Sequence, residues 1–450
     1  MGKYSEYKTI NLPWLAKIPA NWELIRNKQF LREKKDIVGD LSNQFTLLSL
    51  TLRGVIKRDL SEKKGKLPGS FDTYKIISPG DIIFCLFDMD ETPRTVGLSE
   101  YDGMLTGAYT VFQVNGINPQ FLYYYYLSLD NIKALRPLYT GLRKTIKTDT
   151  FLALKLPVPP RAEQDQIVRF LDWKVSEINK LIGIRRKEIQ ELEEYRAVKL
   201  AFTTHYGVNK SRKIKDSGYS WIGGVPDDWH VRAFSKVAVV KSNLVQPENY
   251  MDEMQVSPAS IEKNTGKIIQ TQTVRESGII SGNHRFYKGQ ILYSKVRPLL
   301  NKVTIAPFDG LCSADMYPIE TTLDTKYFVY FMLSQNFLGQ LSMSGNRVKM
   351  PKINQDELSS ILILFPDIKE QEHIVTKLDQ LFALVDDQIE RIKQDISLLQ
   401  ELKSVVISNT VTGKIDVRNI PIPAYEHVDD MVADDGEGND EETGIPGEED

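Results

Sequence analysis

Hydrophobic residues with helical spacing dominate two long stretches of this chain. From Glu163 to about Thr203 the sequence contains one glycine and no proline, and its apolar residues recur at intervals of three and four. These positions are Val168, Leu171, Val175, Ile178, Ile182, Ile189 and Leu192, with Arg185 as an interruption. A second, uninterrupted series consists of Val375, Leu378, Phe382, Val385, Ile389, Ile392, Ile396 and Leu399. The two series predict coiled-coil helices over residues 161–206 and 368–410.

The stretches before the two helices have a different pattern. Over residues 1–160 and 207–367, short apolar and aromatic runs are separated by Gly, Pro, Asn and Asp, which predicts mixed, strand-rich domains. A C-terminal segment, 411–425, follows the second helix. The last stretch, 426–450, holds twelve acidic residues and no Lys or Arg, so it is expected to be a disordered, solubilising tail.

The two strand-rich stretches repeat one another. Two tryptophans and the proline between them return 207 residues later, as Trp14, Pro19 and Trp22 and then as Trp221, Pro226 and Trp229. Further matches in the same order pair Gly141 and Arg143 with Gly345 and Arg347, and Glu163-Gln164 with Glu370-Gln371. Because whole segments recur in order, the chain is expected to contain two similar domains.

The helices and the repeat together predict an architecture. Each helix of about 40 residues would be roughly 60 Å long, and its apolar stripe must be buried. The first helix leads from the first domain to the second, and the second helix departs from the second domain, so their pairing requires an antiparallel arrangement. The predicted fold is α+β: two repeated mixed α/β domains separated by two long antiparallel coiled-coil helices, in a dumbbell with a pseudo-twofold axis. Two similar domains at a fixed distance suit a ligand with two parts.

Motifs for catalysis and cofactor binding are missing from the sequence. It has no GxxxxGK(S/T) or GxGxxG phosphate loop, no HExxH and no CxxC, and its five histidines are scattered. Cys85 and Cys312 each lie in an apolar run, as expected of buried reduced thiols. Pro366-Asp367 with Glu401 and Lys403 resembles a nuclease motif, but the last two lie on a predicted helix. The chain itself is therefore expected to have no catalytic residue, metal or cofactor.

Charge and hydropathy indicate the cellular compartment and the type of ligand. The N-terminus lacks the basic and then apolar pattern of a signal peptide, and no stretch has the ~18 apolar residues that a membrane span requires. A cytoplasmic protein without membrane contact is expected. Removing the twelve acidic residues of the tail raises the net charge from −3 to +9. A body of this charge is compatible with nucleic-acid binding.

Basic residues in loops with aromatic neighbours are the candidate DNA contacts, because Lys and Arg bind phosphates and Arg also reads base edges. In the first domain they are Arg53, Lys57, Arg94, Arg143, Lys144 and Lys147. In the second domain they are Lys263, Lys267, Lys295, Arg297, Arg347 and Lys349. Taken singly, each is expected to be an ordinary surface charge. Arg143 and Arg347 stand out because they recur at matched positions after a glycine.

The repeated tryptophan segments allow two interpretations. Trp14, Trp22, Trp221 and Trp229 could stack on bases, but their apolar and proline neighbours favour packing of each domain onto the helices. With Pro19 and Pro226 they are also candidate docking residues for a partner. The aromatic run Tyr123–Tyr126 has no polar alternation and is expected to be buried.

Several of these segments together resemble the DNA-specificity (S) subunits of Type I restriction-modification systems, over nearly the whole chain. The resemblance rests on the repeated Trp-Leu/Ile-x-x-Ile/Val-Pro-x-x-Trp segments, on Leu156-Pro157-Val158-Pro159-Pro160 and Phe365-Pro366 before the Glu-Gln pairs, and on Val411-Thr412-Gly413-Lys414-Ile415-Asp416-Val417. It implies two target-recognition domains, each reading one half of a split, asymmetric double-stranded DNA target, with the helices as a ruler. The acidic tail is not a feature of that family.

The resemblance also implies partners. S subunits of this kind have no catalytic residues and dock two modification (methyltransferase) subunits, which bind S-adenosylmethionine and methylate adenine. Restriction and translocase subunits, which use ATP and Mg, join them for cleavage. The exposed helix faces and the repeated Trp and Pro segments would then be the docking sites.

Two other functions remain open from the residues alone. The chain could be a non-catalytic tandem-repeat adaptor whose coiled coil organises proteins, without sequence-specific DNA binding. A free-standing nuclease is the third possibility, and metal-dependent cleavage by the purified chain would favour it.

Overall fold

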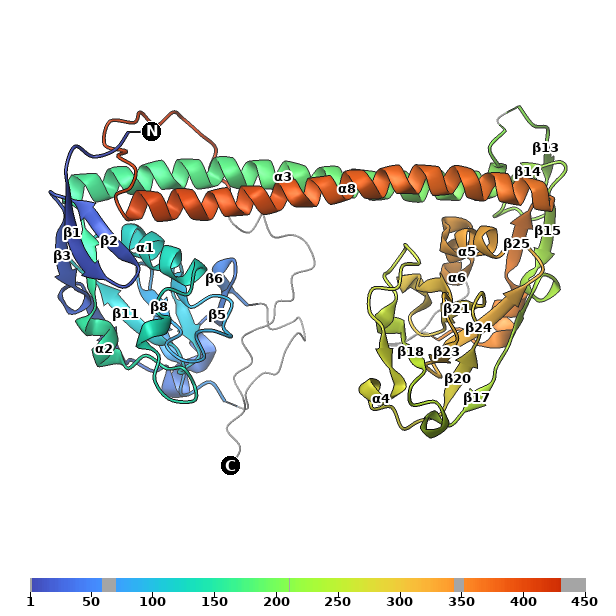
Figure 1. The fold of residues 1–450 in the computed structure, drawn as a ribbon, viewed down its shortest axis with the longest axis horizontal. Helices are drawn as coiled ribbons and strands as arrows, with labels where there is room; N and C mark the ends of the chain where they lie inside the picture. Colours follow the sequence, from blue (N-terminus) through green and yellow to red (C-terminus); the bar gives the residue numbers. More distant parts are fainter. Residues whose placement is uncertain (1, 59–69, 210, 344–351, 430–450) are drawn as a thin grey trace. The chain divides into compact units, whose positions relative to one another are not determined.

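The computed structural model describes residues 2–58, 70–209, 211–343 and 352–429. The chain divides into two compact units: unit 1 comprises Met1–Lys187 and Ile392–Asp450, and unit 2 comprises Glu188–Arg391. Each unit thus combines one strand-rich stretch with parts of both long helices (Figure 1). Within the described residues, no helix has both the length and the apolar content needed to cross a bilayer.

The long helices, α3 (Arg161–Tyr206) and α8 (Ile368–Val411), form where the heptad patterns predict them. In unit 1 the two helices share a small apolar core of Ile178, Ile182, Ile396 and Leu399, and the start of α3 packs with the end of α8. In unit 2, Arg196 of α3 donates to Asp386 of α8 (2.8 Å), and Leu200 shares a core with Phe382. Because positions advance along α3 as they retreat along α8, the helices are antiparallel in each unit, as predicted.

Unit 1 is built on a four-stranded antiparallel sheet of order β4-β11-β8-β9. Its strands are β4 (Leu31–Lys34), β8 (Ile82–Phe84), β9 (Val96–Leu98) and β11 (Thr110–Val114). Four antiparallel pairs accompany the sheet: β1 (Tyr7–Leu12) with β2 (Leu15–Pro19), β3 (Glu23–Arg26) with β12 (Lys155–Val158), β5 (Leu48–Thr51) with β6 (Gly54–Lys57), and β7 (Lys75–Ile77) with β10 (Gly103–Leu105). The shorter helices are α1 (Pro119–Asn131) and α2 (Thr148–Ala153).

Unit 2 contains a four-stranded antiparallel sheet of order β16-β24-β21-β22 and a second sheet of order β17-β20-β23-β18-β19. The first has β16 (Ala238–Val240), β21 (Ile291–Ser294), β22 (Val303–Ile305) and β24 (Met316–Thr321). The second has β17 (Leu244–Val245), β18 (Met254–Val256), β19 (Gln272–Thr273), β20 (Asn283–Phe286) and β23 (Gly310–Cys312). The unit also has two strand pairs: β13 (Ile214–Asp216) with β14 (Gly224–Pro226), and β15 (His230–Ala233) with β25 (Leu362–Phe365). Its short helices are α4 (Val274–Ser277), α5 (Thr325–Leu333), α6 (Gln335–Met343) and α7 (Gln355–Ser360).

The sequence repeat is a repeat of structure. The first hairpin, the pair that precedes each long helix and the four-stranded sheet occur in both units in the same order. The two units differ in the extent of the second sheet: β18 and β23 pair in parallel over three residues, whereas the described residues of unit 1 keep a single parallel bridge between Leu47 and Met104 at the matching place. The predicted fold class, two repeated α+β domains with two long antiparallel helices, is confirmed.

The helix that follows the last strand of each four-stranded sheet begins at a capping side chain. Asn118 accepts hydrogen bonds from the backbone N–H groups of Gln120 and Phe121 at the start of α1, and Asp324 accepts one from Tyr327 in α5. Tyr124, Tyr125 and Tyr126 are buried in α1 and Tyr123 is half-buried, so the predicted burial of the aromatic run is confirmed for three of its four residues. The free thiols of Cys85 and Cys312 are buried too, and burial raises the pKa of Cys312 to about 12.

The chain after α8 runs back along α3 within unit 1. We call residues 414–429 the C-terminal strap. Gln166 Nε2 of α3 donates to the carbonyls of Val417 (3.1 Å) and Ile420 (2.8 Å), and Asn179 Nδ2, further along α3, donates to Val428 (3.0 Å). Of the predicted acidic tail, only residues 426–429 belong to the described part, and residues 430–450 lie outside it.

Candidate nucleic-acid interface

Three of the candidate DNA contacts of unit 1 lie at one turn. A β-bridge between Thr140 and Thr145 closes this turn just before α2. Arg143 is exposed within the turn, Lys144 follows it and is half-buried, and Lys147 is exposed immediately before α2. The structure therefore brings these three cations together on the surface.

The turn adjoins the loop between β8 and β9. Lys144 Nζ lies 3.3 Å from Asp90 Oδ2 and 3.5 Å from Glu91 Oε1 of that loop. The hydrogen bond with Asp90 raises the pKa of Lys144, so this amine stays charged. Asp90 also accepts from Arg136 Nε (2.8 Å), which leaves the carboxylates of the loop paired with cations.

The other candidates of unit 1 differ in exposure. Arg53 lies in the turn between β5 and β6, and Lys57 ends β6 with its Nζ 4.7 Å from the centroid of the Tyr101 ring. Arg94 is more enclosed: its Nη1 lies 3.8 Å from Asp130 of α1, and its Nη2 lies 3.5 Å from a carbonyl in the β5–β6 turn. Arg94 thus ties this turn to α1 and serves the fold.

In unit 2, Lys295 and Arg297 lie in the loop between β21 and β22. Lys295 Nζ is 5.1 Å from the centroid of the Tyr317 ring. Arg297 is exposed and has a positive φ of 48° directly before Pro298, a conformation that non-glycine residues rarely adopt. Arg347 and Lys349 lie outside the described residues, so their predicted role stays a prediction.

Lys263 and Lys267 flank a tight loop with two different neighbours. The backbone N–H of Asn264 donates to the carbonyl of Asn301 (3.2 Å), which places this loop against the β21–β22 loop. Lys267 Nζ instead lies 2.8 Å from Asp386 Oδ2 of α8. The loop of Lys263 thus contacts the loop that carries Arg297, whereas Lys267 is held against a long helix.

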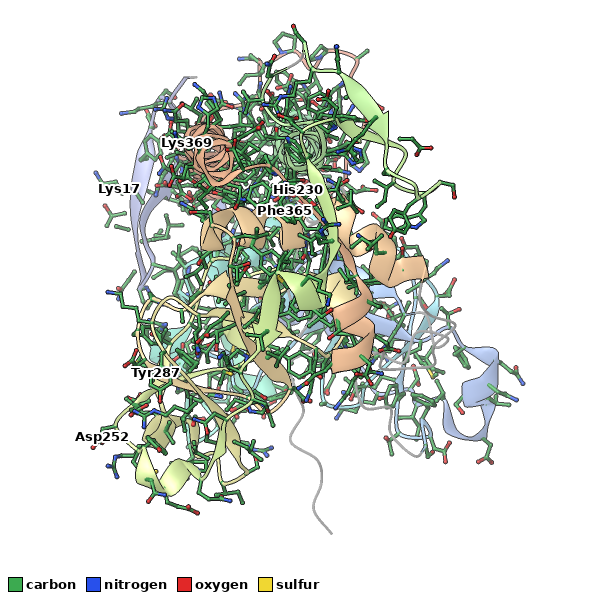
Figure 2. The ribbon with its side chains drawn as sticks, turned by 90° about the vertical axis from the view of Figure 1, so that its right-hand side faces the viewer. Lys17, His230, Asp252, Tyr287, Phe365 and Lys369 are labelled. Atoms are coloured by element: carbon green, nitrogen blue, oxygen red, sulfur yellow. The ribbon has the colours of Figure 1, made fainter. Side chains whose placement is uncertain are left out.

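Arg285, a further basic residue of the second domain, lies against two aromatic rings. The guanidinium carbon of Arg285 lies 4.6 Å from the Tyr250 ring centroid and 5.5 Å from that of Tyr287. Lys369 lies at the start of α8, and Figure 2 shows Tyr287 and Asp252 at the opposite end of unit 2. Tyr287 is two residues from Arg285 in the sequence, whereas Tyr250 comes from a separate segment of the chain.

The repeated tryptophans are unequal. Trp22 and Trp229 have essentially no exposed surface, and Pro19 and Pro226 are buried beside them, which confirms the interpretation as packing anchors. Trp14 is half-buried and donates from Nε1 to the Tyr125 hydroxyl (3.1 Å). Trp221 is 42% exposed. Docking at these segments stays a prediction, and of the four repeated tryptophans only Trp14 and Trp221 offer a partner side-chain surface.

A buried glutamine fixes the start of each long helix. In unit 1, Gln164 accepts from the backbone N–H of Asn118 (2.9 Å) and donates to the Pro159 carbonyl (2.9 Å). In unit 2, Gln371 accepts from the backbone N–H of Asp324 (2.8 Å) and donates to the Pro366 carbonyl (2.8 Å). Each amide therefore joins the cap residue of α1 or α5 to the start of a long helix.

The glutamate before each glutamine has different partners in the two units. Glu163 Oε1 accepts from the Tyr4 hydroxyl (2.6 Å) and from Trp22 Nε1 (2.8 Å). Burial, followed by this hydrogen bond with Glu163, holds the pKa of Tyr4 far above its ordinary value. Glu370 Oε2 lies 2.7 Å from Arg212 Nη1 instead. Both arrangements anchor the helix start, by different chemistry.

Both long helices carry an exposed apolar face near their C-terminal ends. On α3 in unit 2, Tyr195 and Val198 are 45% and 59% exposed. On α8 in unit 1, Leu402 and Val405 are 47% and 45% exposed, each 207 residues after its counterpart. We call these pairs the matched helix faces. Exposed apolar patches of this kind mark protein contact sites.

The described residues contain no cluster of three or more His, Cys, Asp or Glu side chains that could hold a metal ion. What they do offer is cationic loops at two repeated frameworks and matched apolar helix faces. Such an arrangement suits recognition of an extended anionic ligand together with protein contacts.

Comparison with known proteins identifies relatives of the whole arrangement. The family model described as the Type I restriction modification DNA specificity domain matches residues 81–194 and 226–398, well over half of the chain. The chain is 29% identical over 366 residues to the Type I restriction enzyme EcoDI specificity subunit of Escherichia coli, covering 77% of this chain and 79% of the relative. It is 22% identical over 449 residues to the EcoBI specificity subunit of the same organism, covering 90% of this chain and 88% of the relative.

A solved structure supports the fold. A chain from work on complex assembly and conformational transition of the type I R-M system superposes with a TM-score of 0.61. The match covers 88% of this chain and 99% of the other, at 14% sequence identity. At that identity, the likeness is one of fold.

Proposed function

The chain belongs to the Type I restriction modification DNA specificity family, and we propose that it is the non-catalytic specificity subunit of a Type I restriction-modification complex. It acts in the cytoplasm and reads a split, asymmetric target in double-stranded DNA. Unit 1 reads one half of the target and unit 2 reads the other. The long helices set the spacing between the halves.

A single observation carries this proposal: the two units share a framework but differ in the loops that it presents. The loop after β8 in unit 1 holds the carboxylates Asp90 and Glu91, whereas the loop after β21 in unit 2 holds Lys295 and Arg297. A duplicated framework with divergent loops suits two different sequences in one ligand. An unsplit or symmetric target would not need the divergence.

The exposed cations supply two kinds of contact. Lys side chains bind phosphates and fix the position of each unit along the duplex, while Arg side chains can form paired hydrogen bonds with the O6 and N7 atoms of guanine in the major groove. Arg143 and Arg297 are the best placed for base contacts, because both are exposed on loops with backbone conformations fixed by positive φ residues.

The matched helix faces support docking of two copies of one partner. Tyr195 and Val198 on α3 and Leu402 and Val405 on α8 are equivalent by the repeat, so one partner surface can bind both. We assign these faces to modification subunits, which bring S-adenosylmethionine and methylate adenine. Restriction subunits, with ATP and Mg, join the same complex. No step of methyl transfer or cleavage is assigned to this chain.

The first test is single-molecule sequencing of adenine methylation in the source cell, with and without the gene. Deletion is expected to abolish methylation of one two-part motif with a fixed spacer, and an affinity-tagged chain is expected to copurify with two methyltransferase copies. An unchanged methylation pattern together with copurification of unrelated proteins would instead favour the tandem-repeat adaptor.

A further inference from the structure

An apolar side chain stands at the tip of the cationic turn of unit 1. Leu142, between Gly141 and Arg143, has a relative exposure of 104%. No other large hydrophobic side chain of the described residues is this exposed; Ile280 follows at 86% and Ile132 at 67%. Complete exposure of a leucine forgoes the free energy of burying its side chain, which contact with a bound ligand would recover.

The turn that carries Leu142 is braced on both sides. The backbone groups of Thr140 and Thr145 exchange two hydrogen bonds (2.9 and 3.0 Å), and the Thr140 hydroxyl donates to the same Thr145 carbonyl (2.9 Å). The Arg143 carbonyl accepts from the backbone N–H of Asp88 (2.8 Å). The side chain of Leu142 therefore projects from a fixed support.

The backbone of the turn is also strained. Gly141 has φ of 70° and Lys144 has φ of 44°, and the second value is unfavourable for any residue with a Cβ atom. Such strain persists only where surrounding contacts impose it, and it concentrates at ligand-binding sites. The ion pairs of Lys144 with Asp90 and Glu91 (3.3 and 3.5 Å) supply part of that restraint.

Charges around the tip fit a polyanion. Arg143, next to the tip, and Lys147, just after the turn, are both exposed, and the nearby carboxylate of Asp90 is already paired with Arg136 and Lys144. An apolar tip beside exposed cations has the composition of the side-chain wedges that enter a base step while neighbouring cations hold the phosphates.

We propose that Leu142 is an apolar wedge that inserts between stacked bases of the half-site read by unit 1. Lys147 binds a phosphate beside the opened step, and Arg143 reaches the edge of an adjacent base. The inference rests on the proposed function, since it requires duplex DNA bound at unit 1. The repeat places Asn346 at the matching sequence position of the second domain, so wedging is confined to the first half-site.

The test uses the complete complex of this chain with its modification subunits and a duplex carrying the methylated motif. 2-Aminopurine is placed at successive positions of each half-site, because its fluorescence rises when stacking is lost. For the wild-type complex, the 2-aminopurine fluorescence is expected to rise severalfold at one base step of the first half-site. No rise that depends on Leu142 is expected in the second half-site. Leu142→Ala is expected to remove that rise and to weaken specific binding on the order of tenfold.

Two matched variants separate a wedge from a general surface effect. Leu142→Met keeps a long apolar side chain and is expected to retain the fluorescence rise, while Ile132→Ala removes another exposed apolar residue of unit 1 and is expected to change nothing. An undiminished rise in Leu142→Ala, with specific binding intact, would overturn the wedge and leave the proposed function standing. Absence of any sequence preference in the wild-type complex would overturn both.

Discussion

The starts of the two long helices show what the repeat has kept and what it has changed. At both, the glutamine makes the same two hydrogen bonds to backbone groups, with the four distances between 2.8 and 2.9 Å. The glutamate beside it has different partners at the two helix starts. Glu163 accepts from Tyr4 and Trp22, whereas Glu370 pairs with Arg212.

This difference follows from the kind of partner involved. Backbone groups at a buried helix start must be satisfied whatever the surrounding side chains are, so the glutamine geometry persists. A glutamate with side-chain partners can exchange them if the charge stays compensated. In unit 2, the buried Trp229 Nε1 has no hydrogen-bond partner among the described residues, while its counterpart Trp22 donates to Glu163 at 2.8 Å.

The comparison predicts unequal effects of the same substitution. Glu163→Ala leaves the Tyr4 hydroxyl and Trp22 Nε1 buried and unpaired, which is expected to cost unit 1 about 3 kcal/mol of stability. Glu370→Ala breaks one partly exposed ion pair and is expected to cost unit 2 about 1 kcal/mol. Hydrogen exchange followed by mass spectrometry, read on peptides of each unit, measures both losses.

Glu163→Gln is the control, because it keeps an acceptor for Tyr4 and Trp22 and is expected to lose far less than the alanine variant. Equal losses for Glu163→Ala and Glu370→Ala would mean that the two helix starts are energetically equivalent after all.

A smaller contrast concerns the tyrosine that joins each four-stranded unit to its long helix. Tyr124 donates to Asp172 (2.8 Å) in unit 1, and Tyr330 donates to Asp379 in unit 2, where Lys326 also pairs with Asp379 (2.6 Å). Burial raises the pKa of Asp172 above its ordinary value, with the Tyr124 hydrogen bond opposing the shift.

The raised pKa gives a sign to the pH dependence. A carboxyl group whose pKa is higher in the folded state binds its proton more tightly there, so its contribution favours folding at low pH and is lost as the pH rises through the folded pKa. Asp172→Asn keeps an acceptor for Tyr124 and has no charge to bury. It is expected to match or exceed the wild-type stability of unit 1 at pH 7, by up to about 1 kcal/mol, and to lose this advantage at acidic pH.

Asp379→Asn is the matched variant in unit 2, where removal of the charge breaks the ion pair with Lys326, and it is expected to destabilise by up to about 1 kcal/mol at pH 7. The free energy of unfolding of both variants is measured by chemical denaturation at several pH values from acidic to neutral, with hydrogen exchange reporting on each unit separately. Destabilisation of unit 1 by Asp172→Asn at pH 7 would contradict the assigned burial effect.

The parts of the fold that could be predicted are those encoded locally. Heptad spacing defines both long helices, because a helix buries a stripe at that period whatever its partner is. The repeated tryptophans predicted two similar domains with buried anchors, and Trp22 and Trp229 are buried. The order and pairing of the many short strands were not predictable, since they depend on contacts between distant segments.

The candidate interface was less predictable for the same reason. Arg94 and Lys267 look like free surface cations in the sequence, but they pair with Asp130 and Asp386, which are distant along the chain. Leu142 gave no signal, because a single apolar residue in a loop does not reveal its exposure. The path of the C-terminal strap along α3 was equally hidden, since it depends in part on hydrogen bonds from α3 side chains to backbone carbonyls.

The central claim is that each unit reads its own half of one split target. The most direct measurement is genome-wide adenine methylation in cells that carry Arg143→Ala or Arg297→Ala in place of the wild-type chain. Arg143→Ala is expected to relax the sequence requirement in one half of the motif only, and Arg297→Ala in the other half only, with the spacer unchanged. If both variants reduce methylation evenly across an unaltered motif, the two arginines contact phosphates alone; if both relax the same half, the assignment of one unit to each half-site is wrong.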